Sequence, residues 1–375
     1  MSTDTTTGTP SSAAHVAFAT PPAWTCEADD SESTRQLIAE IRSLARTRRA
    51  VILAHNYQLP RVQEVADLLG DSLYLSMKAR ETKADRIVFC GVHFMAESAD
   101  ILARAEQHVI LPDLAAGCSM ADMANVDQVE VAFEHLGGQA RVLPVTYMNS
   151  SAAIKAFTGR NGGAVCTSSN APRLLTWALA ERERLLFLPD QHLGRNTAAA
   201  LGIKHADMAV WDPHLSPARN LAAGCEQARV ILWKGHCSVH TKFLPEHVAA
   251  VRARIPGVHV LVHPECTFEV VRLADSHGST ERIIATVDAA PAGAQFAIGT
   301  EINLVARLAR RHPDKTIVSL SGTQCLCSTM YRIDPARLAE ALENLVAGRI
   351  INEICVESSI AASARLALQR MLACP

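Results

Sequence analysis

The sequence predicts an α/β fold of three similar αβα units with small parallel sheets, packed around a pseudo-threefold axis with the active site at the centre. Short apolar runs alternate with stretches of helical periodicity, which is typical of parallel sheets covered by helices on both faces. The same order of features, from an apolar run to a cysteine, occurs three times along the chain. Repetition of one plan indicates three units rather than one large sheet.

The expected boundaries follow from these repeats and from composition. The N-terminal segment has no basic start and no compact apolar stretch, so we expect a disordered tail rather than a signal peptide. The second unit is the longest, and we interpret its excess as an inserted surface hairpin or lobe near 205–230. The tail is placed at 1–34 and the units at 35–120, 121–240 and 241–330, with the C-terminal segment 331–375 packing back on the first unit.

Composition and charge argue against several classes of protein. Hydrophobic residues make up 49% and charged residues 20% of the chain, which is ordinary for a globular α/β protein. The formal net charge is −2, with lysine and arginine scattered, so no nucleic-acid or anionic-membrane partner is expected. No apolar run approaches the roughly 18 residues that a membrane span needs. We therefore expect a cytoplasmic protein.

Each unit begins with an expected buried strand that ends in polar side chains. The first strand covers 50–54. The three exits are His55-Asn56-Tyr57, Tyr147-Met148-Asn149 and His263-Pro264-Glu265. Because parallel sheets present their functional loops at the carboxyl ends of strands, units packed with these ends inward would bring the exits together in one cavity.

A helical pattern follows the first strand, at 62–69 in the first unit, and a small hydroxyl residue then marks a helix start. These hydroxyls are Ser72, Ser168, and Ser279 with Thr280. A hydroxyl at a helix start offers a side-chain donor and free backbone N–H groups, which suits an anionic ligand. A further strand and polar turn follow in each unit, in "RIVFCGVHF", "RLLFLPDQH" and "QFAIGTEIN", before another helical pattern.

A cysteine closes each unit, at Cys118, Cys237 and Cys327 or Cys325. In a reducing compartment the eleven cysteines are not expected to form disulfides, and most are expected to be packing residues. Three inward thiolates can hold three corners of a [4Fe-4S] cluster and leave one iron open as a Lewis acid. Zinc is the second interpretation, since Cys237 and His240 have a C-x-x-H spacing, but three thiolates suit a closed structural zinc site better than a catalytic one.

Several longer stretches resemble the quinolinate synthase A family. They include "AHNYQ", "GDSLYLS", "FCGVHFMAESADILA", "LPDLAAGCSMADM", "YMNSSAAIKA", "CTSSNA", "GHCSVH", "VHPEC" and "GSTERII", in family order from about residue 50 onward. The resemblance implies condensation of iminoaspartate with dihydroxyacetone phosphate to quinolinate, phosphate and two waters, in de novo NAD biosynthesis. It implies L-aspartate oxidase as the upstream partner, and an oxygen-sensitive [4Fe-4S] cluster on three cysteines at the centre of a pseudo-threefold fold.

The resemblance also implies roles for individual residues. The cluster ligands would be Cys118, Cys237 and Cys327, the last preferred to Cys325 because Met330 stands three residues after it. The substrate contacts would be His55, Ser72, Tyr147, Asn149, Ser168, His263, Glu265, Ser279 and Thr280. The catalytic residues would be Glu265, Tyr57, Tyr147, His263 and His240. Glu265 is the one acid among the strand exits, which favours it as the proton shuttle.

Two other functions are compatible with a three-cysteine cluster. A hydro-lyase acting on a hydroxy acid would use the same open iron, but it would not need the set of hydroxyls expected for a phosphate. A non-enzymatic iron-sulfur sensor would need a partner-binding or DNA-binding surface, and the sequence contains neither a helix-turn-helix pattern nor a basic stripe.

Overall fold

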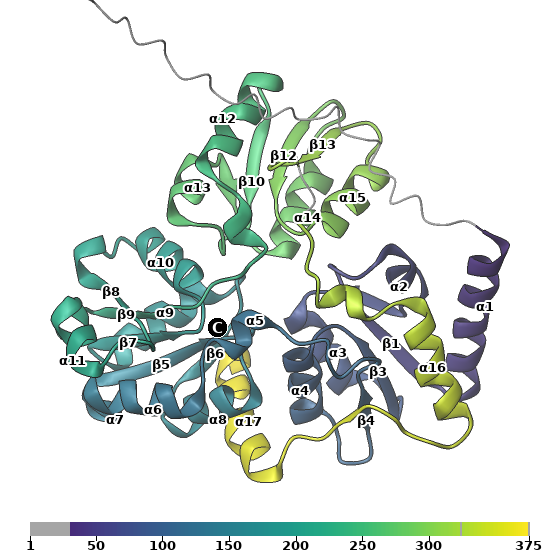
Figure 1. The fold of residues 1–375 in the computed structure, drawn as a ribbon, viewed down its shortest axis with the longest axis horizontal. Coiled ribbons are helices and arrows are strands. Elements are labelled where there is room, and N and C mark those ends of the chain that lie inside the picture. Colours follow the sequence, from purple (N-terminus) through teal and green to yellow (C-terminus); the bar gives the residue numbers. More distant parts are fainter. Residues whose placement is uncertain (1–30, 323–324, 374–375) are drawn as a thin grey trace, which may run out of the picture.

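Three lobes, each with its own sheet, surround a common centre in the computed structural model, which describes residues 31–322 and 325–373 (Figure 1). The predicted fold class, three αβα units with small and mainly parallel sheets, is confirmed. The expected tail lies outside the described residues apart from its last four, and Glu32 already begins the first helix, capped by the Ser31 hydroxyl. No helix among the described residues is long and apolar enough to cross a membrane.

The first unit has a five-stranded sheet in the order β14-β4-β3-β1-β2. Its early elements are α1 (Glu32–Thr47), β1 (Ala50–His55), α2 (Pro60–Val65), β2 (Leu68–Gly70), α3 (Ser72–Glu81), β3 (Arg86–Cys90), α4 (His93–Leu102) and β4 (His108–Ile110). Asp71 caps α3, and its carboxylate accepts the Tyr74 N–H at 2.8 Å. This cap starts α3 at Ser72, directly after the edge strand β2.

The helical pattern expected at 62–69 is only partly correct, because α2 ends at Val65 and Leu68 begins the strand β2. The Asp67 carboxylate accepts the Ile52 N–H at 2.8 Å and holds the segment against β1. Leu68 then pairs in parallel with Leu53. The sequence of Leu68 and Leu69 is compatible with a buried helix or with a short strand. In the structure these residues form a strand because they pair with β1 at the edge of the sheet.

The second unit has an all-parallel sheet in the order β6-β5-β7-β9-β8. Before it come α5 (Ser119–Asp122), α6 (Val126–His135) and α7 (Gly138–Arg141). The unit continues with β5 (Val142–Tyr147), α8 (Ala152–Arg160), β6 (Ala164–Cys166), α9 (Ala171–Glu181), β7 (Arg184–Leu188), α10 (Gln191–Ala200), β8 (Met208–Trp211), α11 (Pro217–Asn220) and β9 (Val230–Trp233). Every residue of β5, β7 and β9 is buried, as expected for parallel strands covered on both faces.

The segment expected as an inserted hairpin or lobe near 205–230 extends this sheet instead. It begins with a 3-10 turn at His205–Asp207 and carries a π-helical turn at Leu221–Cys225. β8 pairs with β9 in parallel, so the connection is a crossover rather than a hairpin. Trp233, at the end of β9, is fully buried and donates from Nε1 to the Met123 carbonyl at 2.8 Å.

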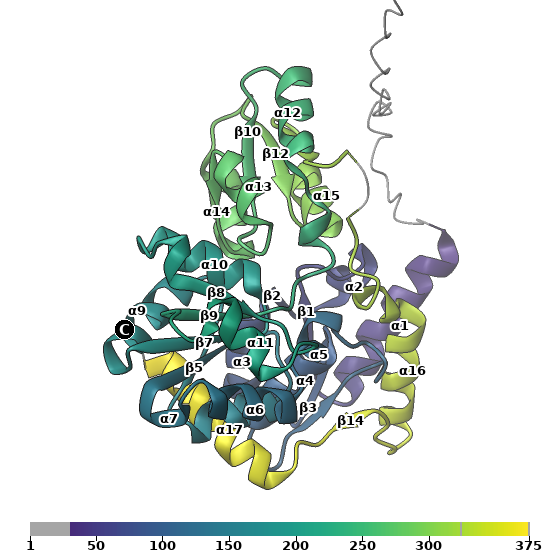
Figure 2. The same cartoon turned by 60° about the vertical axis from the view of Figure 1, so that its left-hand side comes forward.

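The third unit has a four-stranded parallel sheet in the order β11-β10-β12-β13. Its elements are a 3-10 turn at His240–Lys242, α12 (Pro245–Arg254), β10 (His259–Val262), α13 (Phe268–Leu273), β11 (Ser276–His277), α14 (Thr280–Ala289), β12 (Gln295–Gly299), α15 (Ile302–Arg311) and β13 (Thr316–Ser319). In Figure 2 this unit stands above the other two. Its core consists of two separate clusters, whereas the largest cluster is shared by the first and second units.

The C-terminal segment, assigned to the first unit from the sequence, contacts two units. After a 3-10 turn at Met330–Arg332, α16 (Pro335–Val346) packs on α1, and β14 (Glu353–Ile354) pairs antiparallel with β4. The last helix, α17 (Ser358–Ala373), packs mainly on α8 of the second unit. Arg365 of α17 donates to Ile101 O in the first unit, and Arg370 donates to Gly159 O in the second. The segment therefore joins these two units.

Candidate active site

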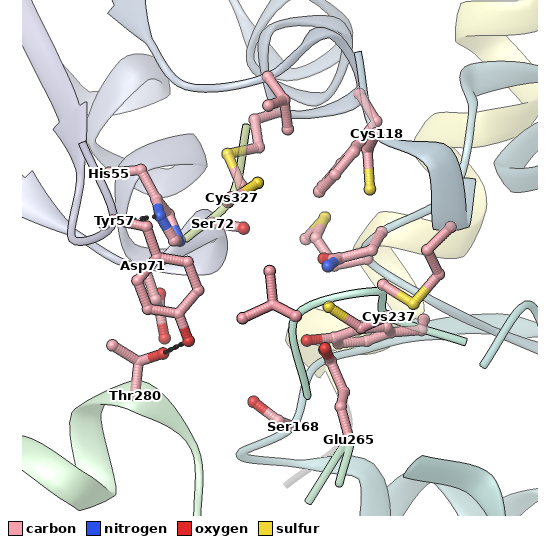
Figure 3. Close-up of a pocket in the computed structure, with 18 of the residues that line it drawn as sticks. His55, Tyr57, Asp71, Ser72, Cys118, Ser168, Cys237, Glu265, Thr280 and Cys327 are labelled. Atoms are coloured by element: carbon pink, nitrogen blue, oxygen red, sulfur yellow. Dashed lines mark hydrogen bonds between the residues drawn. The ribbon is translucent and has the colours of Figure 1, made fainter. Parts of the chain in front are cut away.

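The carboxyl ends of the strands in all three units face one central cavity of about 720 Å³, including the part open to solvent (Figure 3). The cavity is lined by all the expected site residues except Ser279. They are His55, Tyr57, Ser72, Cys118, Tyr147, Asn149, Ser168, Cys237, His240, His263, Glu265, Thr280 and Cys327. The convergence follows from the parallel sheets, because each strand delivers its exit residues to the same edge.

A repeated backbone hydrogen bond fixes the loop that carries each lining cysteine. In every unit the first residue of the helix after the third strand donates its N–H to the carbonyl two residues before the cysteine. The bonds are His93 to Ala116 at 2.8 Å, Gln191 to Gly235 at 3.0 Å and Ile302 to Cys325 at 3.1 Å. By this correspondence Cys327 is equivalent to Cys118 and Cys237, whereas Cys325 takes the place of Ala116 and Gly235. Cys325 is 1% exposed and packs in the core of the third unit.

Cys118 interacts electrostatically with both of the other lining thiols. Burial raises the pKa of Cys118 to about 12, with a further increase from Cys327. Burial also raises the pKa of Cys237 well above its ordinary value, and Cys118 adds to the increase. Thiolates at Cys118 and Cys237 therefore need a bound cation, since a metal deprotonates the thiols that coordinate it. Three soft thiols from three units, facing one space, fit an iron-sulfur cluster (Figure 3).

A second possible ligand set lies at the same place. One ligand atom each from Cys237, His240 and Glu265 lies within 4.8 Å of the others. This set contains Cys237 and His240, the two residues on which the zinc interpretation rests. His240 Nδ1 and Glu265 Oε2 are 2.8 Å apart, however, so these two side chains already satisfy each other. The described residues can thus hold a metal here, and Cys237 belongs to either ligand set.

Glu265 is a buried carboxylate that its neighbours keep ionised. Burial opposes ionisation, but hydrogen bonds from His240 and the Tyr147 hydroxyl favour the carboxylate, and the pKa of Glu265 is lowered. Burial raises the pKa of Tyr147 well above its ordinary value, so the phenol remains a donor. The cavity therefore presents the ionised Glu265 beside neutral hydroxyl donors.

Two histidines at strand exits share one local geometry. His55 Nδ1 accepts the Tyr57 N–H at 3.2 Å, and His263 Nδ1 accepts the Glu265 N–H at 3.3 Å. Burial is the largest cause that lowers the pKa of each ring to about 3, so both imidazoles are neutral near pH 7. A neutral ring that accepts at Nδ1 carries its proton on Nε2, which leaves that nitrogen as the free donor of each ring.

A hydrogen-bonded chain crosses from the third unit to the first. Glu265 contacts His240, His240 Nε2 lies 3.2 Å from the Thr300 hydroxyl, and that hydroxyl lies 2.9 Å from the Tyr57 hydroxyl. The Tyr57 hydroxyl also lies 3.2 Å from the Thr280 hydroxyl (Figure 3). Burial raises the pKa of Tyr57 strongly, which keeps the phenolic proton in place. Each member of the chain can pass a proton to the next.

Three positions differ from the sequence-based expectation. Thr300, fully buried, was missed, although it directly follows β12, as the polar exits follow the first strands. Asp71 was missed as a lining residue, and its signal was the helix-cap position before Ser72. Ser279 instead caps α14, accepting the Arg282 N–H at 3.3 Å, and it lines a neighbouring hollow beside Ser168.

The chain is similar to known proteins over most of its length. A family model described as "Quinolinate synthetase A protein" matches residues 39–373. The quinolinate synthase of Acidobacterium capsulatum is 59% identical over 328 residues, which covers 86% of this chain and 88% of the relative. That of Herpetosiphon aurantiacus is 56% identical over 330 residues, with 86% and 88% covered. That of Geobacillus kaustophilus is 55% identical over 330 residues, with 87% and 89% covered.

Proposed function

Because this chain belongs to the quinolinate synthase A family and is therefore an enzyme, we propose that it condenses iminoaspartate with dihydroxyacetone phosphate. The products are quinolinate, phosphate and two waters, in de novo NAD biosynthesis. L-aspartate oxidase would supply the imine, and the reaction would take place in the cytoplasm without nucleic-acid or membrane partners. The observation that carries the proposal is the meeting of three thiols, one ionised carboxylate and many neutral donors in one cavity.

The cofactor in this proposal is a [4Fe-4S] cluster. Cys118, Cys237 and Cys327 would hold it, one thiolate from the end of each repeat, and no fourth protein ligand is required. When bound, such a cluster supplies an open iron that acts as a Lewis acid toward the substrate. The repeated backbone hydrogen bond supports this ligand set over one that contains Cys325.

Neutral donors would bind the anionic groups of the two substrates. Ser72 and Thr280 are the first residues of α3 and α14, so each adds a hydroxyl to the free N–H groups of its helix start. His55 and His263 offer Nε2–H donors, and Asn149 and Ser168 line the same space. Neutral donors such as these can bind the carboxylates and the phosphate group of the substrates through hydrogen bonds.

Glu265 would remove the carbon-bound protons during ring closure. Its carboxylate is ionised at neutral pH and lies in the cavity with Cys237. The proton taken at the carboxylate can leave through His240 and Thr300 to the Tyr57 hydroxyl, which could then protonate a departing hydroxyl. Tyr147, hydrogen-bonded to Glu265, would keep the base oriented. The phenol of Tyr147 and the imidazole of His263 complete the set of catalytic residues.

The test is anaerobic purification, iron and sulfide analysis, and incubation with iminoaspartate and dihydroxyacetone phosphate. We expect about four irons per chain and formation of quinolinate that requires both substrates. A cluster with no quinolinate would favour a hydro-lyase acting on a hydroxy acid. Bound zinc in place of iron would favour the Cys237, His240 and Glu265 ligand set and would contradict the proposal.

A further inference from the structure

The central cavity has an unusual charge balance for a site that would hold anions. Asp71 and Glu265 are acidic, and among the described residues that line the cavity there is no lysine or arginine. A [4Fe-4S] core held by three thiolates would keep a net negative charge, and two anionic substrates would add to it. Positive charge behind the lining would offset this excess, because uncompensated like charges in a buried site are strongly unfavourable.

Lys155 is a buried lysine close to one end of this cavity. It lies in α8 and is fully buried, and its Nζ donates to Ser150 O, the carbonyl next to Asn149. The Nζ is also 5.3 Å from the centre of the Phe94 ring, and Phe94 lines the cavity. Lys155 thus lies just behind the lining, where a lysine costs more to bury than an apolar residue would.

The charges that act on Lys155 are Glu97 and Cys118. Burial lowers the pKa of the Lys155 amine to about 8, while Glu97 and Cys118 both act to raise it. The amine is therefore positive near pH 7 even before any ligand arrives. Glu97 is partly engaged elsewhere, because its Oε2 accepts the Ala152 N–H at 2.9 Å and its Oε1 lies 3.7 Å from His93. On the cavity side, a thiolate at Cys118 would also favour the protonated amine.

We propose that Lys155 is the fixed counter-charge for the thiolate-held cofactor and acts through the Cys118 side of the cavity. The assignment rests on the proposed function, since it concerns the same cofactor. A buried cation near the cluster stabilises its reduced state, which is more negative, relative to its oxidised state. The effect is strong because the charges interact through a medium of low dielectric constant. Net charge near an iron-sulfur cluster is one of the factors that set its reduction potential. Lys155 is thus a positioning and electrostatic residue, and it is not placed against the substrate.

The sign of the effect separates this role from a purely structural one. Lys155→Met keeps an unbranched, slightly shorter side chain but removes the positive charge, so the midpoint potential of the cluster should become more negative. Glu97→Gln keeps the acceptor for Ala152 N–H but removes a negative charge beside the same amine, so the potential should become less negative. Loss of packing alone would not move the two variants in opposite directions.

The experiment is a redox titration of the reconstituted proteins, followed by the electron paramagnetic resonance signal of the reduced cluster, with iron per chain measured on each sample. Lys315→Met is the matched control, because Lys315 also donates to a backbone carbonyl, Val287 O at 2.7 Å, but lies outside the cavity lining. We expect wild-type iron content in all the variants and a wild-type potential in the control.

Each result bears on a separate claim. Unchanged potentials in both variants, or shifts in the same direction, would overturn the role of Lys155 while leaving the proposed function intact. If Lys155→Met does not bind the cluster, an unchanged or lowered potential in Glu97→Gln overturns the role on its own. A wild-type protein without any cluster would overturn the proposed function and the role of Lys155 together.

Discussion

His55 and His263 show how a residue type and its position in a repeat together determine chemistry. His55 is the last residue of β1, and His263 directly follows the equivalent strand β10. Each ring accepts the N–H two residues later, so both have the same tautomer and the same free donor. The sequence predicts this pair, because a histidine ends the first strand in both units. It does not predict the partner of His240, since Thr300 lies 60 residues further along the chain.

Glu265→Gln tests the proposed base. The amide keeps the shape and the hydrogen bonding of the carboxylate, so we expect an intact cluster and near-normal substrate binding. Turnover should fall by roughly 10² to 10⁴, because the group that accepts the proton is gone. The measurement is single-turnover formation of quinolinate, together with the iron spectrum of the same sample. A wild-type rate would remove Glu265 from the chemistry, and a lost cluster would make its role structural.

The cysteine pair near the end of the third unit gives a second test at this scale. Cys327→Ala should abolish both the cluster and the activity, whereas Cys325→Ala should retain both, because Cys325 packs in the core and its carbonyl, not its thiol, is used by Ile302. Iron and sulfide per chain are the measurement. Loss of the cluster in Cys325→Ala and its retention in Cys327→Ala would show that the equivalent backbone hydrogen bonds do not identify the cluster ligand.

Thr280→Val tests the contact with the phosphorylated substrate. Loss of a hydroxyl donor to a charged group costs about 1.5 to 3 kcal/mol, so the KM for dihydroxyacetone phosphate should rise by roughly 10-fold to 100-fold. Tyr57 keeps its hydrogen bond to Thr300 at 2.9 Å, which limits indirect effects. Thr286→Val, in the same helix with its hydroxyl bonded to Arg282 O, is the control. An unchanged KM would place the phosphate elsewhere.

At the scale of elements, the helix caps and the edge strands decide how each unit presents its site. Asp67 accepts the Ile52 N–H in the first unit, and Asp275 accepts the Val260 N–H at 2.7 Å in the third, so each fixes a short edge strand beside the first strand of its unit. The sequence predicted the long strands well, because buried parallel strands are continuous apolar runs. It misjudged the end of 62–69, where Leu68 and Leu69 join a sheet, and it did not predict the edge strand β8 within 205–230, because both strands depend on contacts that only the assembled unit supplies.

The packing of α17 on α8 is tested by Gly159→Ala. A Cβ at Gly159 would lie 1.9 Å from Ser363 O, so one helix must shift. We expect the free energy of unfolding to fall by about 1 to 3 kcal/mol, as for other overpacked contacts. Thermal or denaturant unfolding measures it. Leu366→Ala, at a position 45% exposed on α17, should have much less effect, and equal losses in both variants would argue against close helix packing.

At the scale of the whole molecule, the three units are not joined equally. The first and second units share the largest core cluster and are tied together by α17, whereas the third unit has its own clusters. The first and third units are linked through Asn56, which accepts from Arg307 at 2.7 Å and donates to Glu281 at 3.1 Å. The repeats in the sequence predicted three units around a centre, but this inequality depends on contacts between distant segments.

Asn56→Ala tests the link between the first and third units. It removes two hydrogen bonds from a buried position and leaves the Arg307 charge without its amide partner. We expect faster hydrogen exchange in α14 and α15, with little change in β5, β7 and β9. Hydrogen–deuterium exchange resolved by peptide is the measurement. Equal acceleration in all three units would indicate general destabilisation instead.

The assignment of one cysteine to the end of each unit also matters for the chain as a polymer. Positions 118, 237 and 327 are far apart in sequence, and a group bonded to all three would act as a cross-link that closes two long loops. In the chain-entropy model, closing a loop of about 100 residues lowers the conformational entropy of the unfolded chain and so raises its free energy by roughly 4 to 5 kcal/mol. If the proposed cofactor is bound to all three cysteines, its loading should favour the folded chain much as a disulfide does, and its removal should lower the free energy of unfolding as well as turnover.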